Sequence, residues 1–311
     1  MTSPPIRRIL VATDFSECAG RALEYAAILA GAYSAPVELL HVVEALSDMD
    51  HDSVASSHYF ELCRKQAERP LDELATHLAE GGLAAKWRLH LGIPSQQINA
   101  VATDCGADLV VLGTHGRTGL ADVALGSTAE RVVRGAPCPV LTVRSVQGQH
   151  RLVGNHVAGA APVIGRILTP VDFSPCSLEA LDYAADIAHV FCAAVTILHV
   201  IEPIFYDLDV ALGHIVQERE KREEAESQLS ELVDRLKRRG LSVQTAVRGG
   251  ITGDSILAGA QGQGCNLIVM GTHGRRGLSQ LRTGSIAEAV LRQAQCPVLT
   301  VKSRKGPHPG P

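Results

Sequence analysis

Aromatic residues are scarce in this sequence, and so are several features that mark specialised protein classes. Only 4% of the residues are Phe, Trp or Tyr, whereas 46% are hydrophobic, so we expect a core of Ala, Leu, Val and Ile, as in buried parallel sheets. No apolar run approaches the roughly 20 residues that a membrane-spanning helix needs. The N-terminal residues show neither the charged nor the apolar stretch of a signal peptide. These absences predict a cytoplasmic protein that does not enter the membrane.

An excess of charge of one sign is also missing. The 29 Lys and Arg residues nearly balance 33 Asp and Glu residues and leave a net charge of −4, which gives no electrostatic reason to expect a nucleic acid partner. The eight cysteines are scattered and none belongs to a C-x-x-C pair, so neither a zinc ribbon nor a thioredoxin-type motif is indicated. Most of them stand among apolar residues and are expected to be reduced and inert.

An internal repeat divides the chain of 311 residues, which is long enough for about two domains of ~150 residues. ILVATDFSEC at 9–18 matches ILTPVDFSPC at 167–176, and PCPVLTV at 137–143 matches QCPVLTV at 295–301. The offset is 158 positions in both cases, which indicates a duplicated domain rather than a solenoid. We predict a first domain at 1–145, a linker rich in Gly and Ala at 146–165, a second domain at 166–303 and a flexible tail at 304–311.

Apolar runs alternate with helical patterns through the first repeat. Strands are expected at 6–13, 37–42, 86–91, 109–112 and 140–143, and helices from Ser16, at about 58–80, at about 95–104 and from Ala129. Pro70 is expected to kink the second helix or to begin a new segment. The charge run of the long helix in the second repeat, at about 216–239, is interpreted as a solvated face. This order predicts an α/β protein of two tandem Rossmann-like domains, each a doubly wound five-stranded parallel sheet with helices on both faces.

One glycine pattern follows the fourth strand of both repeats. Gly113-Thr-His-Gly116 is followed, after nine intervening residues, by Gly126-Ser-Thr128, and Gly271-Thr-His-Gly274 is followed, again after nine residues, by Gly284-Ser-Ile286. Glycine lets the backbone approach a ligand closely. A Gly-Ser pair that opens a helix directs backbone N–H groups and the positive end of the helix dipole toward a phosphate. The pattern therefore predicts one phosphate site in each repeat, and a tight strand-to-helix turn that binds nothing is the alternative.

On these residues the chain resembles a tandem universal stress protein. The resemblance rests on the strand-end Asp14 and Asp172, on the HVVE and HVIE strand ends, and on the G-x2-G-x9-G-[ST] pattern in both halves. It covers nearly all of the chain outside the linker and the tail. The resemblance implies the ATP-binding class of that family, a stress-response sensor or regulator with an adenine nucleotide as ligand. It also implies Mg²⁺ or Mn²⁺ carried on the phosphates and a regulatory protein partner of unknown identity.

The resemblance assigns roles to individual residues. Asp14 and Asp172 would contact the adenosine, and Val42 and Val200 would offer backbone groups to the adenine. Pro170 keeps the proline that the family often has two residues before the strand-end Asp, whereas the first half has Ala12 there. The ribose and phosphates would lie against the glycine pattern, which comprises Gly113, His115, Gly116, Gly126, Ser127 and Thr128 in the first half and Gly271, His273, Gly274, Gly284, Ser285 and Ile286 in the second.

Several of these residues have a purely structural interpretation as well. Asp14 and Asp172 are as suited to cap the helix that follows each of them as to contact a ligand, and one carboxylate could do both; Ser16 is the other candidate cap of the first helix. His41 and His199, on apolar strands, are interpreted as satisfied, partly buried histidines. His51 and His58 stand near three aspartates, Asp48, Asp50 and Asp52, but the set has no recognised ligand spacing, so no metal site is predicted there.

The function predicted from the sequence is binding rather than efficient catalysis. The phosphate donors are not accompanied by an activated nucleophile or a positioned base. Slow ATP hydrolysis or autophosphorylation stays open, and so does a non-catalytic interaction scaffold with vestigial nucleotide sites. The last strands of the two halves, 140–143 and 298–301, are expected to pair within one chain as a pseudo-dimer, which would remove two exposed edges. Further homodimerisation of two chains stays open.

Overall fold

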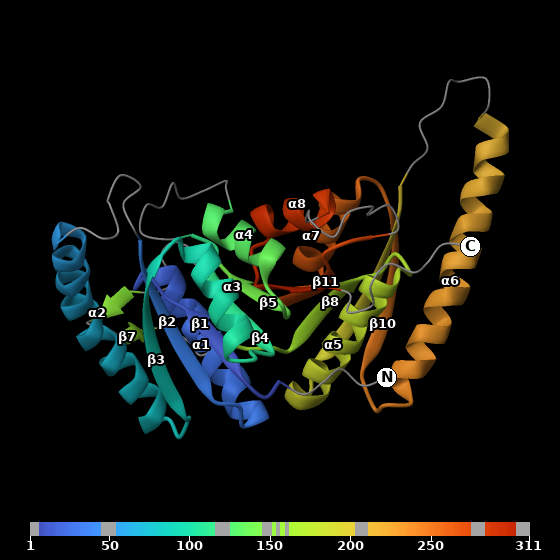
Figure 1. Cartoon of the computed structure of the whole chain (residues 1–311). Coiled ribbons are helices and arrows are strands. Elements are labelled where there is room, and N and C mark those ends of the chain that lie inside the picture. The colour runs from blue at the N-terminus through green and yellow to red at the C-terminus, as the bar shows by residue number, and fades with distance from the viewer. Residues whose placement is uncertain are drawn as a thin grey trace. The chain divides into compact units, whose positions relative to one another are not determined.

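The structure is a computed structural model that describes residues 6–44, 54–115, 125–144, 151–153, 156–158, 162–202, 211–274 and 284–302 (Figure 1). The chain divides into two compact units, an N-terminal unit that ends at Pro162 and a C-terminal unit that begins at Val163. Each unit is described by itself below.

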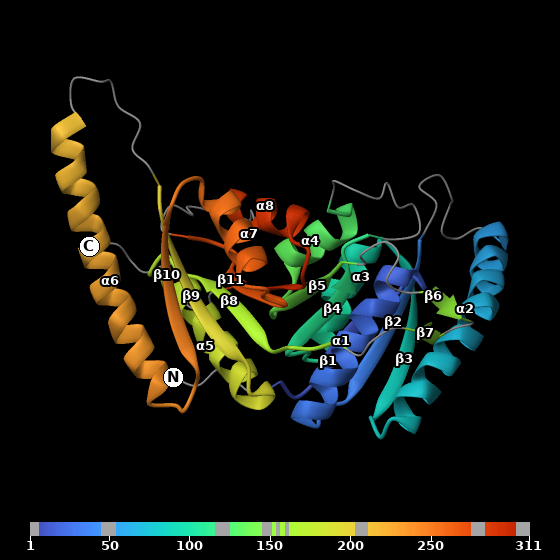
Figure 2. The ribbon, with the colours of Figure 1, turned by 180° about the vertical axis from the view of Figure 1, so that it is seen from behind.

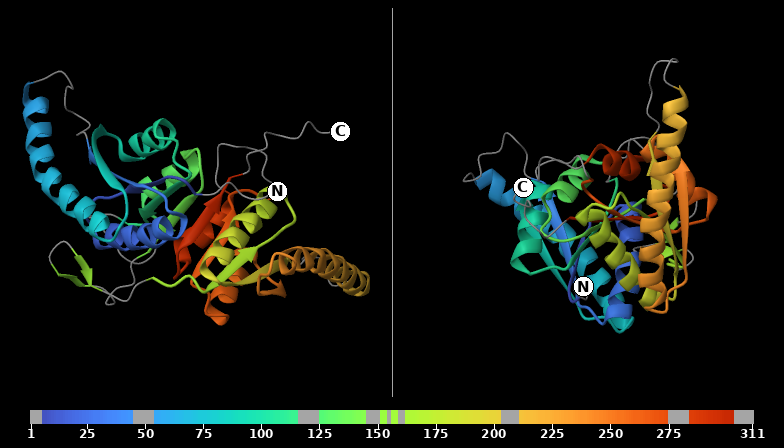
Figure 3. Two further views of the ribbon diagram at one scale, coloured as in Figure 1. Left: turned by 90° about the horizontal axis from the view of Figure 1, so that it is seen from below. Right: turned by 90° about the vertical axis from the view of Figure 1, so that its right-hand side faces the viewer.

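The N-terminal unit alternates strands and helices. Five strands form its main sheet and pair in parallel in the order β3-β2-β1-β4-β5. Figure 3 shows α1 and α2 on one side of this sheet and α3 and α4 on the other. The elements are β1 (Ile9–Ala12), α1 (Glu17–Tyr33), β2 (Val37–Glu44), α2 (Val54–Glu80), β3 (Ala85–Gly92), α3 (Pro94–Asp104), β4 (Leu109–Gly113), α4 (Ser127–Gly135) and β5 (Val140–Val143).

The C-terminal unit repeats this arrangement, with parallel strands in the order β10-β9-β8-β11-β12 (Figure 2). Each unit is therefore a doubly wound five-stranded parallel sheet, which confirms the predicted fold. The elements are β8 (Arg166–Pro170), α5 (Pro175–Phe191), β9 (Ala194–Ile201), α6 (Ala211–Lys237), β10 (Val243–Gly249), α7 (Thr252–Gly262), β11 (Leu267–Gly271), α8 (Ser285–Gln293) and β12 (Val298–Val301).

The central strands form the core of each unit. Ile9, Leu10 and Val11 of β1 are completely buried, as are Ile167 and Leu168 of β8. Helices cover both faces of these strands, so successive residues are apolar instead of alternating with polar ones. Each such side chain contributes about 1.5–3 kcal/mol through burial.

Three segments differ from the sequence-based expectation. β1 begins at Ile9, three residues later than expected, although Ile6 before it is buried. α2 starts at Val54 and continues through Pro70. Residues 146–165, expected to be a linker, contain two short antiparallel strands, β6 (Arg151–Val153) and β7 (His156–Ala158), and strands of three residues are too short for alternation to reveal them.

The long charged helix α6 is solvated on one side, as predicted. Leu229 and Leu236 are buried, whereas the glutamates at 223, 224 and 226 are exposed. Arg235 forms an ion pair with Asp182 of α5, with 3.1 Å between Nη2 and Oδ1. None of the helices within the described ranges is both long and apolar enough to cross a membrane.

Candidate functional site

The carboxyl end of the first strand in each unit turns tightly into the next helix. The Asp14 carboxylate accepts a hydrogen bond from the Ser16 N–H, with 3.1 Å between the heavy atoms, and Ser16 in turn caps α1 by accepting from Ala19 N–H at 3.2 Å. Asp172 Oδ1 accepts from the backbone N–H and from the hydroxyl of Ser174, at 3.0 and 2.6 Å. The helix cap is thus the serine, and each aspartate orders the turn that carries it. The idea that the aspartates themselves cap these helices is therefore wrong.

Phe15 and Phe173, which follow these aspartates, have left-handed backbones with φ of 63° and 62°. A bulky residue in this region stores strain, and such positions gather at functional sites. The Phe15 ring lies against His41, with 4.6 Å between centroids, and Phe173 lies against His199 at 4.8 Å. Sequence reasoning missed this conformation, because nothing but a recurrent Asp-Phe-Ser marks it.

His41 and His199 are satisfied, as predicted. Nδ1 of His41 lies 2.7 Å from the carbonyl oxygen of Thr13, and Nδ1 of His199 lies 2.7 Å from that of Val171. Both rings therefore tie the second strand of their unit to the turn at the end of the first.

The first glycine of each pattern is required by packing within the chain. A Cβ on Gly113 would lie 2.9 Å from Cys18 Sγ and 3.0 Å from the Cys18 carbonyl carbon, and a Cβ on Gly271 would meet Cys176 equally closely. The first turn of α1 or α5 therefore rests directly on the end of the fourth strand. This contact explains the glycine without any ligand, which is a reason that the sequence alone does not reveal.

The third glycine of each pattern brings the strand end and the following helix together. Gly126 donates its N–H to the Thr114 carbonyl oxygen at 2.8 Å, and a Cβ there would lie 2.8 Å from the same oxygen. Gly284 repeats the hydrogen bond to Thr272 at 2.8 Å. The N-terminus of α4 or α8 is consequently fixed beside the loop that leaves the fourth strand.

Both of these helix N-termini lack a side-chain cap. Gly126 and Gly284 are the N-cap residues of α4 and α8, and neither helix start has a side-chain capping hydrogen bond. The first N–H groups of such a helix have no intrahelical partner, and they carry the positive end of the helix dipole. Ser127 and Ser285 begin the two helices with exposed side chains, so hydroxyls and N–H groups stand together at this point.

The remaining predicted residues surround the same strand ends. Asp172 lies against the loop glycine, because a Cβ on Gly274 would be 2.5 Å from Asp172 Oδ2. Val42 and Val200 lie two residues beyond the last β2 and β9 residues paired with β1 and β8. Pro170 ends β8. Thr128 is half-buried and Ile286 is exposed on the first turns of α4 and α8, whereas Gly116 lies outside the described residues.

A histidine follows the fourth strand in each unit. Nδ1 of His115 lies 2.9 Å from Thr114 Oγ1, and Nδ1 of His273 lies 2.9 Å from Thr272 Oγ1. A Cβ on Gly126 would be 3.9 Å from the His115 Cα. The histidine is therefore adjacent to the uncapped helix N-terminus in both units.

Within the described part of the chain, no group of three or more His, Cys, Asp or Glu side chains is arranged to hold a metal ion. The cluster around His51 lies outside that part, apart from His58. The metal-binding interpretation of the cluster is thus neither supported nor tested.

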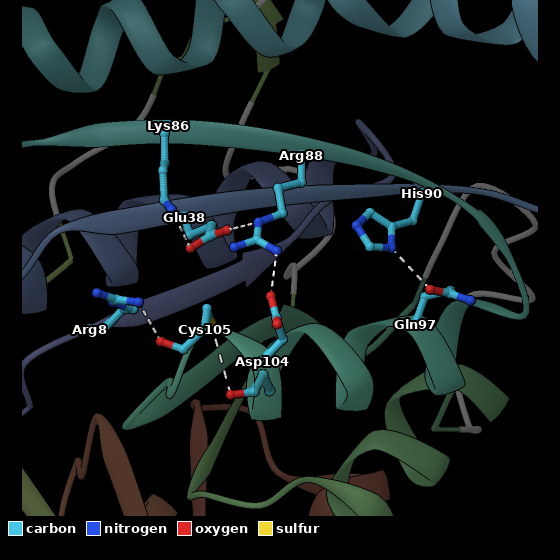
Figure 4. Close-up of polar contacts among 9 residues, drawn as sticks. Arg8, Glu38, Lys86, Arg88, His90, Gln97, Asp104 and Cys105 are labelled. Atoms are coloured by element: carbon cyan, nitrogen blue, oxygen red, sulfur yellow. Dashed lines mark hydrogen bonds and ion pairs between the residues drawn. The ribbon is translucent and has the colours of Figure 1, made fainter.

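A charged cluster occupies the opposite, amino end of the first sheet (Figure 4). Glu38 on β2 is 1% exposed and forms ion pairs with Lys86, at 3.2 Å, and with Arg88. Arg88 also donates to Asp104 at 2.7 Å. In the C-terminal unit the three charged residues are replaced by uncharged ones: Thr196, at the place of Glu38, donates to the amide oxygen of Gln263 at 2.6 Å and accepts from Gln244 at 3.1 Å.

A sequence profile of the universal stress protein family matches residues 5–144 and, a second time, residues 164–302. The chain belongs to the universal stress protein family. A universal stress protein of Methanocaldococcus jannaschii is 33% identical to it over 139 residues, which span 44% of this chain and 82% of that protein. One of Coxiella burnetii is 35% identical over 138 residues, or 43% of this chain and 94% of the relative.

Among solved structures, a universal stress protein from Archaeoglobus fulgidus matches with a TM-score of 0.69 at 22% identity, covering 95% of this chain and 96% of that one. At this identity the likeness concerns the fold. The two profile matches together make the chain a tandem universal stress protein, as the repeated motifs predicted.

Proposed function

We propose that this tandem universal stress protein binds ATP at the carboxyl end of each sheet and uses it as a regulatory signal. The observation that carries the proposal is the uncapped N-terminus of α4 and α8, held by Gly126 and Gly284 against the loop that leaves the fourth strand. Oriented N–H groups at a helix start favour a phosphate. The carboxyl edge of a doubly wound sheet is also where ligands of such folds bind.

The neighbouring residues suit the other parts of a nucleotide. Asp172, which lies against Gly274, can accept hydrogen bonds from ribose hydroxyls. Val42 and Val200, beyond the last pairs with the first strand of their unit, can offer backbone groups to a base. Any Mg²⁺ or Mn²⁺ would be held mainly by the phosphates.

The test is calorimetric titration of the full-length protein with ATP. Ser127→Asp and Ser285→Asp place a negative charge at the first residue of α4 and of α8, where it favours the helix dipole but repels phosphate. We expect each variant to lose one site, with affinity there reduced at least about tenfold, and to keep its melting temperature. Ser230→Asp on the exposed face of α6 is the matched control and should bind as the parent does.

A second candidate function, a non-catalytic interaction scaffold, is favoured by the packing role of the glycines. Gly113 and Gly271 contact Cys18 and Cys176 so closely that the fold itself needs them. If the parent chain shows no heat of binding at millimolar ATP, the nucleotide proposal fails and the scaffold stands. Release of inorganic phosphate from ATP that is reduced in each aspartate variant and abolished in the double Ser127→Asp/Ser285→Asp variant would add slow hydrolysis to the binding function.

We further propose that the final strands of the two halves, β5 and β12, pair within one chain. The proposal rests on the family resemblance and on the terminal place of each strand in the order of its own unit. A Thr142→Cys/Thr300→Cys variant with its eight native cysteines replaced tests this directly. Crosslinking independent of protein concentration would support the pairing, and crosslinks solely between chains would contradict it.

A further inference from the structure

One ring nitrogen of His115 is buried and has no partner in the described part of the chain. Nδ1 contacts the Thr114 hydroxyl at 2.9 Å, but Nε2 is buried and has no hydrogen-bond partner among the residues that the structure describes. Buried polar atoms are nearly always hydrogen-bonded, and the exceptions call for an explanation. The contact at Nδ1 determines what Nε2 can do, because a neutral imidazole carries one proton.

The neighbours of Thr114 decide where that proton lies. The Thr114 side chain is buried, and its hydroxyl lies 3.9 Å from the sulfur of Cys18. The Cys18 thiol itself donates to the Val143 carbonyl oxygen at 3.1 Å. If Nδ1 carried the proton, Thr114 would have to accept it, and the hydroxyl proton would be left to a distant sulfur, which is a weak acceptor. If Nε2 carries the proton, Thr114 donates to Nδ1, the thiol donates to Val143, and Nε2–H is the one donor of the trio that is left for a ligand.

We propose that Thr114 is a positioning residue that holds His115 in the Nε2–H tautomer, so that Nε2–H donates to a phosphate oxygen of the bound nucleotide. The inference rests on the proposed nucleotide binding and specifies one of its donors. The backbone of His115 lies against Gly126, the N-cap of α4, so the histidine side chain starts beside the helix N–H groups to which Nε2–H would be added. In the C-terminal unit, Thr272 and His273 repeat the 2.9 Å contact.

The tautomer can be measured without any ligand. ¹⁵N NMR of the full-length protein labelled at histidine, recorded at mildly alkaline pH, distinguishes a protonated from an unprotonated ring nitrogen, and His115→Gln identifies the signals of His115. We expect Nε2 to be protonated and Nδ1 unprotonated in the parent and in Thr114→Ser. Thr114→Val should mix the tautomers or reverse them. A protonated Nδ1 in the parent would overturn the inference.

The donor role is tested by ATP titration in the Ser285→Asp background, in which the second site is disabled. Thr114→Val should weaken binding about tenfold, the size expected for a misdirected hydrogen bond, whereas Thr114→Ser should keep the affinity. His115→Gln presents an amide N–H close to the place of Nε2–H. An amide has no tautomer for Thr114 to select, so this variant should retain most of the affinity for ATP. Adding Thr114→Val to His115→Gln should then change nothing.

Two results would contradict this reasoning. An equal loss from Thr114→Val with and without the His115→Gln substitution would show that the threonine acts without the histidine. A parent chain that binds no ATP would remove the nucleotide proposal and the donor role together, while the NMR experiment would still decide whether Thr114 sets the tautomer. Melting temperatures of all variants separate these outcomes from unfolding.

Discussion

The charged cluster at the amino end of the first sheet predicts an asymmetric response to mutation. Glu38 is 1% exposed, whereas the side chains of its partners Lys86 and Arg88 are 59% and 31% exposed. Replacing both cations by methionine leaves a buried carboxylate with neither partner, which costs about 3–5 kcal/mol of the free energy of unfolding. Glu38→Gln leaves cations that reach water, and Arg88 keeps Asp104, so we expect a smaller cost of about 1–2 kcal/mol.

The C-terminal unit supplies the control. Glu38→Thr, Lys86→Gln, Arg88→Ala and Cys105→Gln together install the neutral set built around Thr196. Replacing a whole buried ionic group by a satisfied neutral one is often neutral or stabilising, so we expect a change within about 1 kcal/mol of the parent, far from the loss in the double methionine variant.

Urea unfolding followed by fluorescence measures these differences in the unit concerned. Trp87 is the sole tryptophan of the chain, lies between Lys86 and Arg88 on β3, and donates its ring N–H to Asp72 of α2 at 2.6 Å. Its emission therefore reports the unfolding of the N-terminal unit. Two results would refute the reasoning. One is a loss of stability in Glu38→Gln as large as that in the double methionine variant. The other is a loss of more than about 3 kcal/mol in the four-residue variant that installs the neutral set.

Three further predictions concern single groups. Burial raises the pKa of Asp182 despite the nearby Arg235. The stability that Asp182 contributes is therefore fully present below its unfolded pKa of about 3.9 and is lost as pH rises through the folded pKa. The urea midpoint of the parent should fall relative to that of Asp182→Asn as pH increases, and a difference between the two midpoints that does not change with pH would contradict this. Burial raises the pKa of Cys296 to about 12, so maleimide at about pH 8 should modify the exposed Cys192 first and leave Cys296 intact in peptide mass spectra, and early labelling of Cys296 would show the opposite. Ser34 and Cys192 end α1 and α5 with left-handed φ of 53° and 52°, so Gly at either position should raise stability by about 0.5–1 kcal/mol in thermal unfolding, and an unchanged or lower melting temperature at both positions would contradict this.

The order of the elements could be predicted because it depends on patterns that span many residues. Apolar strands such as 109–112 and helical stripes such as Leu71 and Leu78 of α2 reveal themselves through periodicity and are buried in the structure. The element ends were less accurate. Ile6 is apolar and buried yet precedes β1. It was assigned to the strand because a buried apolar residue looks the same in a sequence whether it lies in a sheet or just outside one.

The sequence predicted which positions surround the candidate site, but it did not reveal the structural reason why several of those positions hold the residues they do. The sequence cannot show that an absent Cβ on Gly113 would lie 2.9 Å from Cys18 Sγ, since that contact joins residues 95 positions apart. The left-handed Phe15 was missed because the usual sequence signal for positive φ is glycine. The order of the Asp14–Ser16 turn was also hidden, because both side chains are good helix caps.

The packing role of the glycines, beside the nucleotide-binding role proposed for them, bears on how such a protein changes during evolution. A descendant that had lost the proposed nucleotide binding would still have to keep Gly113 and Gly126, because helix and strand backbones meet there. Selection on the exposed Ser127 would relax at once, since no packing of its side chain depends on it. Drift should therefore erase the hydroxyls long before the glycines. The two halves differ at this turn, where Thr128 of the first corresponds to Ile286 of the second, so if ATP binds as proposed, the first turn of the helix is the better record of which site is in use.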